Sequence, residues 1–68
     1  MTTGTVKWFN PNKGFGFIQP DDETEDNFVH ISAVKRAGLE TLLEGQKVEY
    51  ELVEDRHGQV SADNLKLV

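Results

Sequence analysis

The strongest constraint on the fold is the close spacing of turn residues, which divides the 68-residue chain into short segments. The densest turn signal is Asn-Pro-Asn-Lys-Gly at residues 10–14, because proline fixes φ while asparagine and glycine tolerate positive φ. The segments between the turns are β-branched and aromatic, or they alternate in polarity as half-buried strands do. We expect strands at residues 5–9, 15–19, 27–31, 46–53 and 59–67.

Five strands at this spacing, with an irregular connection between the third and the fourth, predict an all-β fold. The expected architecture is a five-stranded antiparallel Greek-key OB-fold barrel with one short helical turn between strands three and four. Ser32 is expected to cap that turn over residues 33–36, and Gly38 to end it. An SH3-like barrel is the alternative on strand count alone. We expect the open end of the barrel to be covered by Leu39, Leu42 and Leu43.

The length predicts a single domain over residues 1–68, with a thin core because a chain of this size buries only about 60% of its unfolded surface. The absence of cysteine excludes a disulfide framework and thiolate metal sites. No apolar run approaches the roughly 18 residues of a membrane span, so we expect no membrane partner. The residues expected to line the barrel are Val6, Ile18, Val29, Val48, Tyr50, Leu52 and Leu65.

The alternation of glycine and phenylalanine at residues 14–17 is the most informative pattern for function. In a strand, Phe15 and Phe17 project to one side while Gly14, Gly16 and Ile18 face the other. Glycine weakens a strand, so this arrangement is costly for folding alone. It is explained if the backbone must curve and both rings must stay open for unstacked bases. The alternative is that both rings are core residues. The aliphatic residues and the tyrosine expected to line the barrel already fill its interior, which disfavours this alternative.

The third strand repeats the pattern, since Phe28 and His30 share one face there. If strands two and three pair, four rings lie together, and Trp8 on the first strand joins them. Strict alternation puts Lys7 on the opposite face from Trp8, so placing both on one surface requires a bend or bulge. Alternation does not settle the side on which Phe9 lies.

The charge balance is acidic, with a net charge of −5 from 12 acidic and seven basic residues. A nucleic-acid-binding domain usually carries a basic surface. Lys7 and Lys13 are nevertheless the only charges in the first twenty residues, while the acids cluster at residues 21–26 and 49–55. We therefore expect a mildly basic aromatic face on which stacking dominates and electrostatics is secondary.

Catalysis and metal binding find no support in the sequence. There is no phosphate-binding glycine loop, and Ser32 and Ser61 have no evident Asp–His partners. The acidic run at residues 21–26 lacks the glycine and the later glutamate of a calcium loop, and His30 and His57 have no third ligand. We expect no enzyme activity, no cofactor, no metal and no small-molecule substrate.

Several strings of this sequence resemble the bacterial cold-shock protein family in order and spacing. They are Lys-Trp-Phe-Asn at 7–10, Lys-Gly-Phe-Gly-Phe-Ile at 13–18, Pro-Asp-Asp at 20–22, Phe-Val-His at 28–30, Ser-Ala at 32–33 and Glu-Gly-Gln-Lys-Val at 44–48. The resemblance implies an OB barrel that binds single-stranded RNA and DNA, with a preference for pyrimidines. It also implies RNA-chaperone activity without ATP, a role in regulating transcription or translation during cold adaptation, and location in the cytoplasm. We expect a monomer.

The same resemblance assigns nucleic-acid contacts to individual positions, and Asn10 is added because alternation places it on the face of Trp8. Two departures replace frequent aromatic residues of the family by Ile31 and Leu39, which predicts that fewer nucleotides are held. Asn27 replaces a usual aliphatic residue and is expected to thin the core. The predicted binding residues are Lys7, Trp8, Asn10, Lys13, Phe15, Phe17, Phe28, His30 and Arg56.

Two other functions use the same residues. A barrel adaptor could grip a proline-rich peptide on its rings, as SH3-like domains do, although Lys7 and Lys13 beside the rings disfavour a basic peptide. Sequence-specific duplex binding needs an element that fits a groove and many phosphate contacts, which seven basic residues do not favour. Whether the protein prefers a single strand, a proline-rich peptide or a duplex distinguishes single-strand binding from these two other functions.

Overall fold

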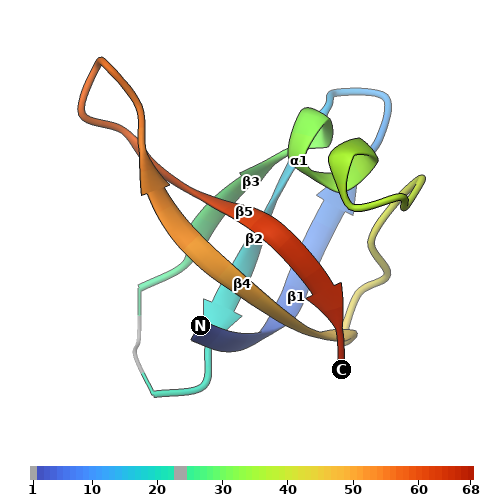
Figure 1. Cartoon of the computed structure of the whole chain (residues 1–68). Helices are drawn as coiled ribbons and strands as arrows, with labels where there is room; N and C mark the ends of the chain where they lie inside the picture. The colour runs from blue at the N-terminus through green and yellow to red at the C-terminus, as the bar shows by residue number, and fades with distance from the viewer. Residues whose placement is uncertain (1, 23–24) are drawn as a thin grey trace.

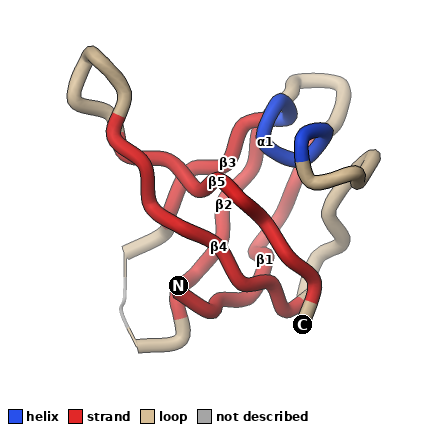
Figure 2. Tube along the Cα trace, viewed as in Figure 1, coloured by secondary structure: helices blue, strands red, loops and turns tan. Residues whose placement is uncertain are grey.

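Five strands and one short helix make up the part of the chain that the computed structural model describes, residues 2–22 and 25–68. The strands close into a barrel in the order β1–β2–β3–β5–β4 (Figure 1). Figure 2 shows the helix at one end of this barrel, at the start of the connection from β3 to β4. The elements are β1 (Thr2–Asn10), β2 (Phe15–Pro20), β3 (Asn27–His30), α1 (Ile31–Arg36), β4 (Lys47–Glu54) and β5 (Val60–Leu67).

The predicted barrel and its helical turn are confirmed, and one strand pair adds to the prediction. β1 pairs with β2 and β4, β2 with β3, and β4 with β5, all antiparallel. β3 and β5 instead run parallel, with Phe28 opposite Ser61 and Val29 opposite Ala62. These two strands are far apart in sequence, and α1 and β4 form the connection that parallel neighbours require. The parallel pair is what closes the barrel.

The core fills the inside of the barrel, and the predicted inner face is correct except at one position. Leu52 is 43% exposed, because the described part of β1 pairs with β4 only as far as Tyr50. Leu52 therefore lies beyond the rim, where β4 and β5 continue as a two-stranded ribbon. The buried cluster is Val6, Ile18, Val29, Ala33, Val34, Leu42, Val48, Tyr50, Ala62 and Leu65.

The connection after α1 covers the barrel end with two of the three predicted leucines. Leu42 is buried, and Leu39 packs partly buried against the core. The prediction for Leu43 is wrong, because this side chain is 64% exposed. Leu43 begins a tight turn in which its carbonyl accepts from Gln46 N–H and its own N–H donates to Gln46 Oε1. That turn directs the Leu43 side chain outward.

The close approach of the β1 and β2 backbones explains why a glycine stands at position 16 of the Gly–Phe alternation. Gly16 pairs with Phe9 across β1 and β2 and is buried. A Cβ at Gly16 would collide with the carbonyl oxygen of Trp8 and lie 2.7 Å from Phe9 Cα. Phe9, which alternation does not assign to a side, packs partly buried against the core. Only glycine lets β1 and β2 approach this closely here.

The start of α1 differs from the prediction by two residues. His30, not Ser32, is the N-cap residue, and its side chain accepts a hydrogen bond from Ser32 N–H. Ile31 therefore belongs to the helix and not to the third strand. The predicted end is correct, since Gly38 has a φ of 82° and its N–H donates to Lys35 O. A strand thus passes into a helix with no intervening loop.

Candidate nucleic-acid interface

A bulge in β1 determines the direction of Trp8. Val6 pairs with Ile18 and both are buried, whereas Trp8 pairs with Phe17, so the register shifts by one residue at Lys7. Strict alternation from Val6 would turn the indole into the barrel. The extra residue leaves Trp8 on the outer face instead, 41% exposed, with Lys7 exposed beside it. The bend that the sequence required for Lys7 and Trp8 is therefore present.

β2 and β3 carry the other four rings on the same outer face. Phe15 is paired with His30, and Phe17 with Phe28, so the side chains of each pair stand side by side. The alternate positions face the core, where Val29 is fully buried. Neither Phe15 nor Phe17 belongs to the buried cluster. Their interpretation as core residues is therefore wrong, and their glycine neighbours leave the rings on the surface.

The five rings form one contiguous cluster. Trp8 lies 5.5 Å from Phe15 and 5.4 Å from Phe17 between ring centroids, both in edge-to-face geometry. Phe15 and Phe28 stack at 5.8 Å with an interplanar angle of 22°. His30 continues the cluster 6.4 Å from Phe28. These contacts fix the rings against each other while leaving surface on which flat ligands can stack.

Two lysines lie in segments that border the ring cluster, and they differ in whether they form an ion pair with a described residue. Lys7 Nζ lies 3.3 Å from Asp26 Oδ2, so its charge is shared with the acidic connection between β2 and β3. Lys13 is exposed in the turn between β1 and β2 and forms no ion pair with a described residue. The predicted basic surface therefore consists of Lys13, which has no ion pair among the described residues, and Lys7, which is already paired with a carboxylate.

Asn10 serves the turn that carries Lys13. Its Oδ1 accepts hydrogen bonds from the backbone N–H of Asn12 and of Lys13, at 2.9 and 3.1 Å. Its carbonyl also accepts from Gly14 N–H. The side-chain oxygen of Asn10 thus organises the turn, which in turn fixes the start of β2 and its phenylalanines.

Arg56 is set apart from the ring cluster in the fold. It lies in the turn at the tip of the β4–β5 ribbon, which projects away from the barrel in Figure 1. Asp55 Oδ1 holds this turn by accepting from His57 N–H and Gln59 N–H. Arg56 is exposed in this turn.

The outer face that carries the ring cluster continues onto β5 and β4. This extension was not predicted from the sequence. Phe28 is in register with Ser61 of β5, and Ser61 with Val53 of β4, so these side chains share the outer face. Val53 is 40% exposed. A row from Trp8 through Phe17 and Phe28 thus runs across the barrel toward the ribbon. The signal for this row is the parallel β3–β5 pair, which cannot be inferred from local alternation.

The neighbouring row ends in acidic residues. Asp63 pairs with Glu51, and the carboxylate of Asp63 lies 2.7 Å from Arg36. A bulge at Asn64, with φ of 51°, precedes buried Leu65. Burial would raise the pKa of Asp63, but a hydrogen bond from Asn64 N–H and the Arg36 guanidinium outweigh it and lower this pKa. This row of the outer face is therefore acidic, whereas the row through Phe28, Ser61 and Val53 carries no charged side chain.

The three departures from the resembled family have separate outcomes. Ile31 is half-buried at the start of α1, and a Cβ on Gly14 would touch its Cγ2 at 3.4 Å. Leu39 packs against the core, so neither side chain offers a flat surface. Asn27 donates from Nδ2 to the hydroxyl of buried Tyr50 at 2.8 Å. Asn27 thereby donates a hydrogen bond to a buried polar group.

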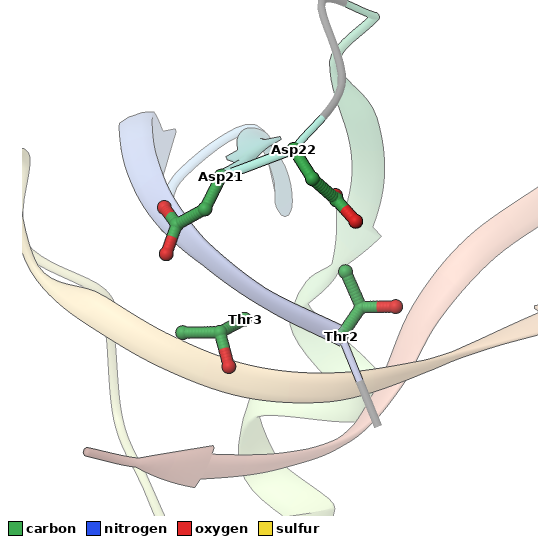
Figure 3. Close-up of a pocket in the computed structure, with 4 residues that line it drawn as sticks. All are labelled: Thr2, Thr3, Asp21 and Asp22. Atoms are coloured by element: carbon green, nitrogen blue, oxygen red, sulfur yellow. The ribbon is translucent and has the colours of Figure 1, made fainter.

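A separate polar cavity of about 310 Å³ lies at the far end of β1, lined by Thr2, Thr3, Asp21 and Asp22 (Figure 3). Asp21 also holds Lys47 at 2.6 Å. The lining offers hydroxyls and carboxylates but no ring. Within residues 2–22 and 25–68, no group of three acidic or histidine side chains is arranged to hold a metal ion. Among the same residues, no helix is long and apolar enough to cross a membrane.

Comparison with known proteins shows the family to which this chain belongs. Residues 2–68 match the family described as the "Cold-shock" DNA-binding domain. The chain is 70% identical to the probable cold shock protein y4cH of Sinorhizobium fredii and 64% identical to cold shock protein CspA of Rhizobium meliloti, each over 97% of both chains. It is 50% identical to cold shock-like protein CspE of Escherichia coli, over 94% of this chain and 93% of that one. The chain therefore belongs to the cold-shock domain family of nucleic-acid-binding proteins.

Proposed function

We propose that this protein binds single-stranded RNA and DNA by stacking unpaired bases on Trp8, Phe15, Phe17, Phe28 and His30. The observation that carries the proposal is the contiguous cluster of these rings on the outer face of three strands. Every base has a flat π-face, and stacking on an aromatic ring contributes about 1–3 kcal/mol per base. A duplex hides those faces, so the cluster favours unpaired strands.

Phosphate contacts are secondary in this mechanism. Lys7, Lys13 and Arg56 are the cations that we assign to the bound strand, although Lys7 must first leave Asp26. About three contacts predict a slope of log K against log salt near −2, at about 0.7 per contact for a single strand. A slope this shallow is the signature of binding held by stacking.

We further propose that the protein acts as an RNA chaperone without ATP. A protein that binds only the unpaired state draws hairpins open by mass action. The family resemblance supports this role, a preference for pyrimidines and a place in the cytoplasm during cold adaptation. A monomer is sufficient, because one chain carries the complete ring cluster.

Single-ring variants test this proposal against a matched control. Phe17→Ala and Phe28→Ala should each weaken binding of an oligothymidine and slow opening of an RNA hairpin. Leu52→Ala is the control, because Leu52 is as exposed as Trp8 but lies outside the ring cluster. Circular dichroism checks that each variant is folded. Equal losses in all three folded variants would contradict the proposal.

A further inference from the structure

Within the described part of the chain, the imidazole of His30 is held by hydrogen bonds at one nitrogen only. As the N-cap of α1, His30 Nδ1 accepts from the backbone N–H of Ser32 at 3.1 Å. The hydroxyl oxygen of Ser32 also lies 2.9 Å from this nitrogen. Nε2 forms no hydrogen bond with any residue that the structure describes. The two ring nitrogens therefore have different surroundings.

These contacts fix the position of the proton in the neutral ring. A hydrogen on Nδ1 would face the Ser32 N–H, donor against donor, so Nδ1 must carry the lone pair. The Ser32 hydroxyl can then only donate to Nδ1, and it shares the single lone pair of this nitrogen with the backbone N–H. The single N–H of the neutral imidazole is consequently at Nε2, on the far side of the ring from the helix.

We propose that His30 is a fixed hydrogen-bond donor of the binding face and that Ser32 is the residue that positions it. The proposal rests on the proposed function and deepens it by naming the ligand chemistry. His30 lies beside Phe28, 6.4 Å away and tilted by 36°. A base stacked on Phe28 therefore has its edge next to the imidazole. Nε2–H selects an acceptor at that edge, a base carbonyl oxygen, and disfavours an amino group.

The arrangement couples ligand contact to the helix cap. Turning the ring to bring Nδ1 outward would leave Ser32 N–H without its partner and uncap α1. The tautomer and the orientation of His30 are thus set before a strand arrives. Such preorganisation makes His30 more selective than a freely rotating histidine, because its donor has one direction only.

Nitrogen NMR of the His30 ring tests the tautomer directly. At mildly alkaline pH the free protein should show the hydrogen on Nε2 and a hydrogen-bonded lone pair on Nδ1. With saturating oligothymidine, the Nε2 hydrogen should become protected from exchange with water. An oligothymidine that carries a single abasic site at the nucleotide beside His30 keeps the phosphates and should lose this protection. Protection that survives every abasic position would show that a phosphate oxygen is the acceptor and would overturn the proposal.

Binding measurements test the role of Ser32. Ser32→Ala keeps the backbone cap but removes the hydroxyl, and it should weaken oligothymidine binding by about two- to fivefold. In a His30→Phe background, which keeps a stacking ring, the same substitution should have almost no effect. Thr41→Ala is the matched control, because Thr41 is exposed in the loop after α1 and its hydroxyl donates to Leu42 O at 3.5 Å, away from His30 and Ser32.

The outcomes separate this inference from the proposed function. If oligothymidine binds and quenches Trp8 but the His30 hydrogen is on Nδ1, the fixed donor is wrong and stacking stands. The same conclusion follows if Ser32→Ala has an equal effect with His30 and with Phe at that position. If oligothymidine does not bind the folded protein at all, the proposed function fails as well.

Discussion

The Lys7 ammonium lies 3.3 Å from the carboxylate of Asp26, so a cation of the binding face is paired with the acidic connection between β2 and β3. The pair is partly exposed, and the net contribution of such surface pairs to stability is only about 0–1 kcal/mol. Its larger consequence concerns binding. A phosphate that approaches Lys7 must compete with a carboxylate already in place.

Asp26→Asn should therefore increase affinity for an oligothymidine while leaving the free energy of unfolding nearly unchanged. The freed ammonium can contact a phosphate without first leaving a carboxylate, so the affinity should rise while the slope of log K against log salt stays near about −2. Titrations at several salt concentrations measure both quantities. Glu25→Gln removes the same charge next to it, from a residue without an ion pair to a described residue, and serves as control. Equal effects of the two variants would show a general charge effect and contradict this pairing.

The bond from Asn27 Nδ2 to the Tyr50 hydroxyl predicts energetic coupling across the barrel end. Asn27→Leu and Tyr50→Phe should each destabilise the fold, because each leaves a polar group of the other residue without this bond. The double variant should be more stable than the sum of the single losses predicts, with a coupling of about 1 kcal/mol. Urea unfolding of the four proteins measures the cycle. Additive losses would mean that the bond contributes nothing.

Gly16 should tolerate an added side chain much less well than Gly45. Alanine at position 16 meets the backbone of β1 at Trp8 and Phe9, and backbone cannot move aside as a flexible side chain can. We expect Gly16→Ala to cost about 3 kcal/mol, a large part of the stability of a small domain. Gly45→Ala is the comparison, because its space is open and only its φ of 83° is unfavourable, at about 1 kcal/mol. Similar thermal stability of the two variants would contradict the close approach.

Asp63 predicts a pH dependence with a defined sign. Its folded-state pKa lies below the ordinary value of 3.8, so the unfolded chain binds its proton first as the pH falls. The stabilisation by its hydrogen bond with Asn64 N–H and its pair with Arg36 is thus present above that value and is lost as the pH falls through the folded pKa. Wild type should exceed Asp63→Asn in stability at neutral pH, by less than about 1 kcal/mol. The difference should shrink below about pH 4. If the stability difference between wild type and Asp63→Asn grew as the pH fell, the predicted sign of the pH dependence would be wrong.

The ring cluster could be predicted because its signal is local. Phe15 and Phe17 alternate with glycine on one strand, and the same period applies to Phe28 and His30. Trp8 requires a bulge, and the need for it is visible once Lys7 and Trp8 are assigned to one face. For Trp8, the structure adds only the position of the bulge in β1.

The remaining features depend on contacts between distant segments. Alternation correctly assigns Leu52 to the inner side of β4 but cannot show that the barrel ends before it. The extension of the face to Ser61 follows from a parallel pair of strands separated by α1 and β4. Serine is a common N-cap, which favours Ser32 in the sequence, whereas His30 takes the role because the strand runs directly into the helix.

Fluorescence of Trp8, the only tryptophan of the chain, tests stacking most directly. The folded protein is titrated with oligothymidine, with duplex DNA and with a proline-rich peptide at low and at raised salt. The ring cluster predicts quenching by the single strand alone, with an affinity that falls only about as the second power of the salt concentration. Quenching by the peptide or the duplex in place of the single strand, or a slope several times steeper, would contradict base stacking as the basis of binding.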